Sequence, residues 1–200
     1  MIIISYFRLF LFCRPVDNFQ RGAAMEPVIR ELKSRFESLN PSEMEQSEYL
    51  SNLTSERLRL IPYPNFAIEF DCPLYLLRFE ERTLAIFGHE LGGYYALDLE
   101  SGTVTYIHQE DTIYRLQYCN SSFDSFLQFH NLFITQVQRR IESGSDPQQA
   151  VEALETEFRR YDSQAMENDE SFWPMRLYEL SDDLFPLNNL RINFYQSILD

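Results

Sequence analysis

Basic residues are scarce in this chain. Its 17 lysines and arginines stand against 31 aspartates and glutamates, which leaves a formal net charge of −14. Proteins that bind nucleic acid neutralise the phosphates with clustered Lys and Arg, and the sequence contains no such cluster. The composition therefore argues against direct nucleic-acid binding. An acidic surface instead favours solubility and speeds encounter with a basic partner, and the sequence leaves both interpretations open.

Cysteines are also few. The three of them, Cys13, Cys72 and Cys119, lie far apart, and an odd number cannot all pair within one chain. Disulfide frameworks belong to oxidising compartments and use even numbers of closely placed cysteines. We therefore expect reduced thiols and a cytoplasmic protein.

No apolar run is long enough to span a bilayer, which takes about 20 residues. The closest is MIIISYFRLFLFC at the start, which Arg8 interrupts and no cationic segment precedes. We expect residues 1–24 to be an extension outside the folded domain and residues 25–200 to form a single domain. A signal sequence or membrane anchor is the alternative for the first segment, and otherwise we expect no membrane association.

Motifs for catalysis and cofactor binding are missing as well. His108 and Glu110 form an H-x-E pair, but the P-C-x-x-C run that completes a zinc deaminase site is absent. There is no G-x-S-x-G nucleophile elbow and no phosphate-binding glycine loop. The sequence predicts no catalytic residue, no metal and no cofactor, hence a protein that is not an enzyme. A site assembled from scattered residues remains the alternative.

What the sequence does contain is a change of period along the chain. Apolar residues recur every three or four positions from Glu26 to Leu39, which predicts a helix, and a second helix is expected from Ser42. Short apolar runs separated by turns then predict six antiparallel strands in a meander. The expected strands are Phe66–Phe70, Leu74–Phe79, Thr83–Gly88, Gly93–Leu99, Thr103–His108 and Thr112–Tyr118.

The helical period returns after Asn120. Ser121 and Asp124 form a capping pattern for a helix that Gly144 would end, and Asp146-Pro147 opens another. A last helix is expected over Phe172–Leu180, before an apolar tail from Pro186. Helices, then strands, then helices indicate an α+β domain, with a mostly antiparallel curved meander sheet flanked by N- and C-terminal helices.

The order of several short motifs resembles the SUKH superfamily of immunity proteins, within it the fourth SUKH immunity group. The resemblance covers about residues 60–182. It is carried by I-F-G, by G-x-Y-x-L-D-x-x-S-G-x-V, by N-S-S-x-x-x-F-L and by S-F-W. The expected structural positions of these motifs are Gly88, Gly93, Asp98, Gly102, Asn120, Ser122, Phe126 and Trp173.

The resemblance implies a non-catalytic cytoplasmic protein that binds a cognate polymorphic toxin and blocks it. Because many such toxins act on nucleic acid through basic clefts, an acidic inhibitor would occlude the cleft. The expected contacts are acids in the sheet loops and one aromatic anchor: Glu80, Glu81, Glu90, Glu110, Asp111 and Tyr94. Each could equally be an ordinary loop residue, and a SUKH-like protein-binding scaffold or regulatory module is the alternative function. The sequence gives no indication of the oligomeric state.

Overall fold

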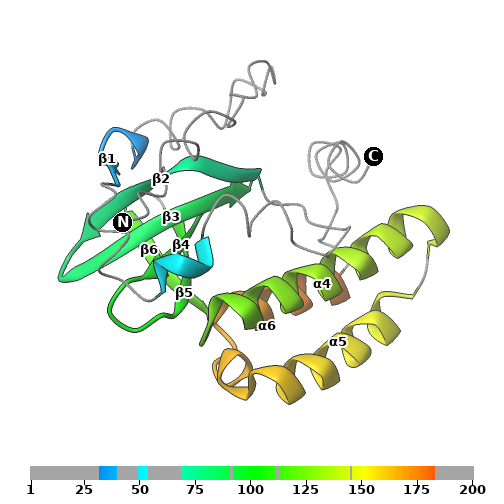
Figure 1. Cartoon of the computed structure of the whole chain (residues 1–200). Coiled ribbons are helices and arrows are strands. Elements are labelled where there is room, and N and C mark those ends of the chain that lie inside the picture. The colour runs from blue at the N-terminus through cyan, green and yellow to red at the C-terminus, as the bar shows by residue number, and fades with distance from the viewer. Residues whose placement is uncertain are drawn as a thin grey trace, which may run out of the picture.

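The computed structural model of the protein describes residues 32–39, 49–53, 69–90, 92–110, 113–144 and 146–182. One open sheet and a layer of helices make up these ranges, so the α+β class is confirmed (Figure 1). The predicted extension 1–24, the helix from Ser42 and the tail from Pro186 lie outside the described residues. The elements are β1 (Glu37–Ser38), η2 (Leu50–Leu53), β2 (Glu69–Phe79), β3 (Arg82–Glu90), β4 (Gly93–Asp98), β5 (Val104–Glu110), β6 (Ile113–Asn120), α4 (Phe123–Ser143), α5 (Pro147–Tyr161), η3 (Ser163–Met166) and α6 (Phe172–Ser181).

The sheet is the predicted antiparallel meander, with its six strands in the order β1 to β6. Short turns between consecutive strands force neighbours to run in opposite directions. One detail of the prediction is wrong. The segments Phe66–Phe70 and Leu74–Phe79 are not two strands, because β2 continues through Pro73, and residues 66–68 lie outside the described ranges. The pairing with β3 shifts between Phe70 and Tyr75, an irregularity of the kind that lets a strand contain proline.

Apolar side chains cover both faces of this sheet. The face toward the helices contributes Leu76, Phe87, Tyr95 and Val104 to the larger core, and the opposite face carries a smaller cluster around Ile86. All six residues of β4 are buried. A strand buried on both sides cannot serve as a binding surface, so β4 is the centre of the scaffold.

The predicted N-terminal helix is only partly present. Leu32 and Lys33 are helical, but Glu37–Ser38 form β1, which pairs with Leu76 and Tyr75 of β2. Leu32 and Phe36 pack against the smaller cluster. Their four-residue spacing therefore reflects burial against the second face of the sheet. The extended backbone of the residues after Phe36 is set by hydrogen bonding to β2. Residues 26–31 lie outside the described part.

Three helices lie together beside the sheet, with α5 alongside α4 and α6 (Figure 1). Gly144 ends α4 in the left-handed conformation, and Asp146 caps α5 ahead of Pro147, as predicted. The predicted N-cap of α4 was wrong by one residue: Ser122, not Ser121, accepts the backbone N–H of Ser125 at 3.1 Å. No helix in the described ranges has the length and apolar character needed to cross a membrane.

Candidate functional site

The structure separates the acids that the sequence suggested as one contact surface. Glu80 and Glu81 form the β2–β3 turn, whereas Glu90 and Glu110 lie at the ends of β3 and β5, at the opposite end of the sheet. A meander alternates its turns between two ends, and the nine residues of β3 span about 30 Å. These residues therefore cannot form one patch. Asp111 and the side chain of Glu90 lie outside what the structure describes.

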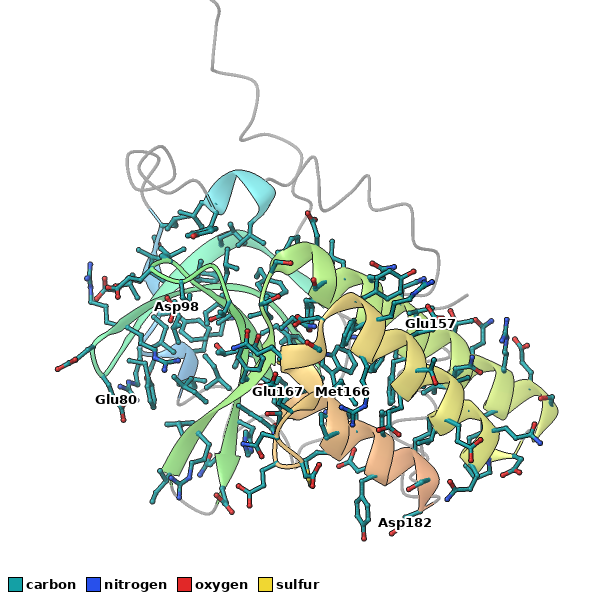
Figure 2. The ribbon with its side chains drawn as sticks, turned by 90° about the horizontal axis from the view of Figure 1, so that it is seen from below. Glu80, Asp98, Glu157, Met166, Glu167 and Asp182 are labelled. Atoms are coloured by element: carbon teal, nitrogen blue, oxygen red, sulfur yellow. The ribbon has the colours of Figure 1, made fainter. Side chains whose placement is uncertain are left out.

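The β2–β3 end of the sheet is acidic. Glu80, Glu81 and Glu100 are exposed there, and within the described residues none of them forms an ion pair. The nearby arginines are already engaged, Arg78 with Glu37 at 3.5 Å and Arg82 with Asp98 at 4.0 Å. Figure 2 shows Glu80 at the extremity of the sheet. This end therefore presents negative charge that neighbouring described side chains do not neutralise.

Glu80 is also unusual in its backbone. Its φ is +54°, in the left-handed region, and among the described residues it is the sole non-glycine with a positive φ. A side chain at such a position costs about 1–2 kcal/mol relative to glycine. The turn thus retains a charged residue where glycine would be less strained.

At the opposite end, Glu110 accepts a hydrogen bond from Arg115 Nε at 3.2 Å, so its charge is partly neutralised. Tyr94 does not have the exposure expected of an aromatic anchor. Its side chain is 3% exposed and packs edge-on against Phe36, with ring centroids 5.0 Å apart, and beside His89. The tyrosine belongs to the core because β4 is covered on both faces.

The motif around Asp98 and Gly102 builds the β4–β5 turn. Asp98 Oδ1 accepts the backbone N–H groups of Glu100 and Ser101 at 2.9 and 3.1 Å. Gly102 has a φ of +71°, and a Cβ there would collide with the ring of Tyr49. The residues that carried the family resemblance therefore close a turn here.

Gly93 is needed for a different structural reason than Gly102. It opens β4 with no positive φ, and a Cβ on it would collide with the carbonyl oxygen of Ile107. Close approach of the two backbones, not turn geometry, requires glycine at this position.

A buried hydrogen-bond network joins the end of the sheet to the helices. Asp162 Oδ2 accepts the side-chain amide of Asn120 at 3.2 Å, the N–H of Ser121 at 2.8 Å and its hydroxyl at 2.9 Å. Asn120 Oδ1 in turn accepts the indole N–H of Trp173 at 2.7 Å. The network thus ties β6, the end of α5 and the start of α6 together. Burial, followed by the charge of Asp162, raises the pKa of Tyr118 nearby.

Sequence reasoning did not single out Asp162. It follows α5 in a polar, acidic stretch with Glu167, Asp169 and Glu170, which are all exposed. Nothing local distinguishes the one buried carboxylate from the three exposed ones. The N-S-S motif offered the only hint, since buried donors need an acceptor from somewhere in the fold.

The histidines lie apart. His130 is buried in the aromatic core next to Tyr95, with a cavity of about 10 Å³ beside it, room for about one water molecule. His108, the last residue of the predicted strand Thr103–His108, lies within β5 and stacks on Tyr106; burial lowers its pKa. In the part of the chain that the structure describes, no three His, Cys, Asp or Glu side chains gather as a metal site would require.

The segment 146–182, which contains α5, η3 and α6, concentrates negative charge. It holds ten acids and three arginines, and each arginine already pairs with an acid of its own helix. Six exposed acids are left without an ion pair among the described residues: Asp146, Glu152, Glu167, Asp169, Glu170 and Asp182. By contrast, α4 has as many arginines as acids.

These features define an α+β domain whose open antiparallel sheet is packed against a helical layer and whose exposed charge is acidic. The chain belongs to the SUKH-4 immunity protein family, whose model matches residues 79–179, about half of the sequence. The match runs from the end of β2 into α6. Neither the curated proteins nor the solved structures contain a match to the chain.

Membership makes this an immunity protein of a toxin system, a protein that binds a cognate toxin protein. The family is generally not enzymatic. The Asn120 and Trp173 motifs by which the family is recognised lie in the buried network described above. They maintain the fold, so the toxin contacts have to be sought among the exposed residues.

Proposed function

We propose that this protein neutralises a toxin that acts on nucleic acid by covering the toxin's basic active-site cleft. The observation that carries the proposal is the excess of exposed acids without ion partners in the described ranges. A cleft that holds nucleic acid is lined by Lys and Arg, and such a surface is complementary to an acidic one. Charge complementarity of this kind speeds association and rejects acidic partners.

Glu80 and Glu81 are the proposed contacts on the sheet. Both side chains are exposed at the β2–β3 turn, and the arginines around them are engaged elsewhere. The left-handed backbone of Glu80 supports this role, because a strained residue that persists at an exposed turn is a candidate for function. Glu110 is a weaker contact since Arg115 shares its charge.

The test uses the toxin domain encoded next to the gene for this chain, purified in a form with its catalytic residue replaced. We expect binding to the full chain to weaken about tenfold or more between about 50 and 300 mM salt. The active toxin domain should lose its cleavage or modification of nucleic acid when the chain is added in stoichiometric amount.

The charge-reversed double variant Glu80→Lys with Glu81→Lys should associate about tenfold more slowly with the toxin domain. Glu142→Lys is the matched control, because Glu142 is exposed on α4, where acids and arginines balance. An affinity that does not change with salt concentration would contradict the proposed mechanism. So would a chain that binds the toxin domain while the toxin continues to act on nucleic acid.

A further inference from the structure

A groove of about 230 Å³ lies between α5 and α6. Its lining includes Val151 and Glu155 from α5, Met166 from η3, and Leu177 and Tyr178 from α6. Figure 2 shows Met166 where α5 and α6 come together. Sites for small molecules usually begin at about 300 Å³ and enclose most of the ligand. A smaller, open groove between two helices suits a side chain presented by another protein.

An exposed aromatic side chain, that of Tyr178, lines this groove, and exposed Met175 lies three residues before it on α6. Four large hydrophobic residues are exposed in the described ranges, and three of them belong to the segment 146–182: Tyr161, Met175 and Tyr178. Met175 is 40% and Tyr178 57% exposed, three residues apart on the outer side of α6. The inner side of the same helix buries Trp173, Leu177 and Leu180. A helix with apolar residues on both sides has a second surface to cover.

Tyr178 is oriented by its neighbour. A hydrogen bond with Asp182 raises the pKa of the Tyr178 hydroxyl. A tyrosine held by such a bond has an exposed ring and a satisfied polar end, which is the form that aromatic anchors take in protein interfaces. Asp182 lies at the end of α6 in Figure 2.

The charged side chains that line the groove favour some binding partners over others. Arg159 lines it, but its guanidinium donates to Glu155 at 2.8 and 3.2 Å and to the carbonyl of Met166 at 3.3 Å. Asp169 lines it without an ion pair from any described residue. The groove therefore has a mixed lining, in which Val151, Leu177 and the ring of Tyr178 lie among polar side chains and Asp169 adds a negative charge. Such a lining suits an apolar side chain with Lys or Arg beside it.

We propose that this α5–α6 groove receives a large apolar side chain of the toxin that is flanked by basic residues. The inference rests on the proposed toxin binding and adds the surface and the chemistry of the contact. A second copy of this chain is a poorer occupant, because two segments that each carry six exposed acids without an ion pair among the described residues would face each other. The groove thereby combines an anchor contact with charge that rejects acidic partners.

The experiment measures the affinity of the inactive toxin domain for the full chain by calorimetry. The double variant Met175→Ala with Tyr178→Ala should bind about tenfold or more weakly, as truncation of an aromatic anchor does. Asp169→Lys should weaken binding several-fold and flatten its salt dependence. Ile113→Ala is the matched control, because Ile113 is 55% exposed on β6 and away from the groove. Its affinity should stay within about twofold of wild type.

All four substituted side chains are exposed, so thermal midpoints within about 2 °C of wild type are expected and verify folding. If the groove variants bind the toxin domain within twofold of wild type while Glu80→Lys with Glu81→Lys binds more weakly, the groove proposal is overturned. The proposed function then still stands. A wild-type chain that fails to bind the toxin domain overturns the proposed function itself. A dimer of this chain that Tyr178→Ala abolishes would assign the groove to a second copy and overturn the inference.

Discussion

The sheet and the helical pair α5–α6 carry their acids in different ways. On the sheet, β4 is buried on both faces, and the exposed acids discussed above sit in turns at two ends about 30 Å apart. The segment 146–182 instead carries six exposed acids without ion partners in the described ranges, and one of them, Asp169, lines a groove that the exposed Tyr178 also lines. Figure 2 shows Glu80 and Asp182 far apart, at the outer end of the sheet and at the end of α6.

The charge that a surface presents and the contact area that it offers to a partner are therefore separable. A turn can present carboxylates that steer a partner, but it offers little apolar area for a lasting contact. A groove between helices offers area as well, so losses there should appear in the dissociation rate. Asp162 joins the two regions through its buried hydrogen bonds, and four substitutions test how far each region depends on the other.

Asp162→Ala should have the largest effect, because it breaks the junction between the two regions. Removing the carboxylate leaves the Asn120 amide and the Ser121 N–H without their acceptor in a buried place. We expect a loss of about 3 kcal/mol in the free energy of unfolding, measured in urea. Asp169→Ala, an exposed acid in the same segment, should change it by less than about 0.5 kcal/mol. Equal losses in the two variants would contradict the network's role.

Gly93→Ala disturbs the sheet alone. The new Cβ would press on the carbonyl oxygen of Ile107, so β4 and β5 have to separate. The expected cost is about 2 kcal/mol in urea unfolding, typical of overpacking. The amide of Ala96, three pairs further along β4, reports in hydrogen exchange whether the register of β4 against β5 is kept. A fully stable Gly93→Ala variant would show that the two backbones can move apart freely.

Glu80→Gly separates stability from binding at the sheet turn. Glycine adopts a φ of +54° without steric cost, but it also loses about 0.5–1 kcal/mol more backbone entropy on folding. The variant should therefore gain only about 0.5–1 kcal/mol of the roughly 1–2 kcal/mol of strain. Association with the toxin domain should nevertheless slow, since a negative charge is lost. Glu81→Gly is the control: Glu81 is exposed in the same turn but has no positive φ. A destabilised Glu80→Gly variant would contradict the strain argument.

His108→Asn probes the smallest effect, at the half-buried end of β5. Burial lowers the pKa of His108 in the folded chain below about 6.5, its value in the unfolded chain. The unfolded chain therefore takes up the proton first, and stability falls as pH drops from about 6.5 toward the folded-state pKa. The stability advantage of wild type over the variant should shrink between pH 7.5 and 5. A difference that is constant with pH would show that the histidine does not titrate on unfolding.

Much of the fold was predictable because its signals are local. The caps at Gly144 and Asp146 and the alternating turns of the meander follow from one stretch of chain at a time. The site was less predictable. Tyr94 looks like a surface tyrosine until the second face of the sheet is covered by Phe36. Asp162 looks like its exposed neighbours until Asn120 and Ser121 donate to it from 42 and 41 residues away.

The α+β order of elements, the acidic balance and the resemblance to an immunity family follow from the sequence alone. Composition, the spacing of apolar residues and the order of motifs are local properties that need no tertiary contact. The tertiary structure decided which acids are neighbours and which carboxylate is buried. It also decided that exposed apolar and acidic groups meet at the α5–α6 groove. The physical reason is that strand direction and helix packing set distances between residues far apart in sequence, and those distances determine whether a charge is solvated, paired or offered to a partner.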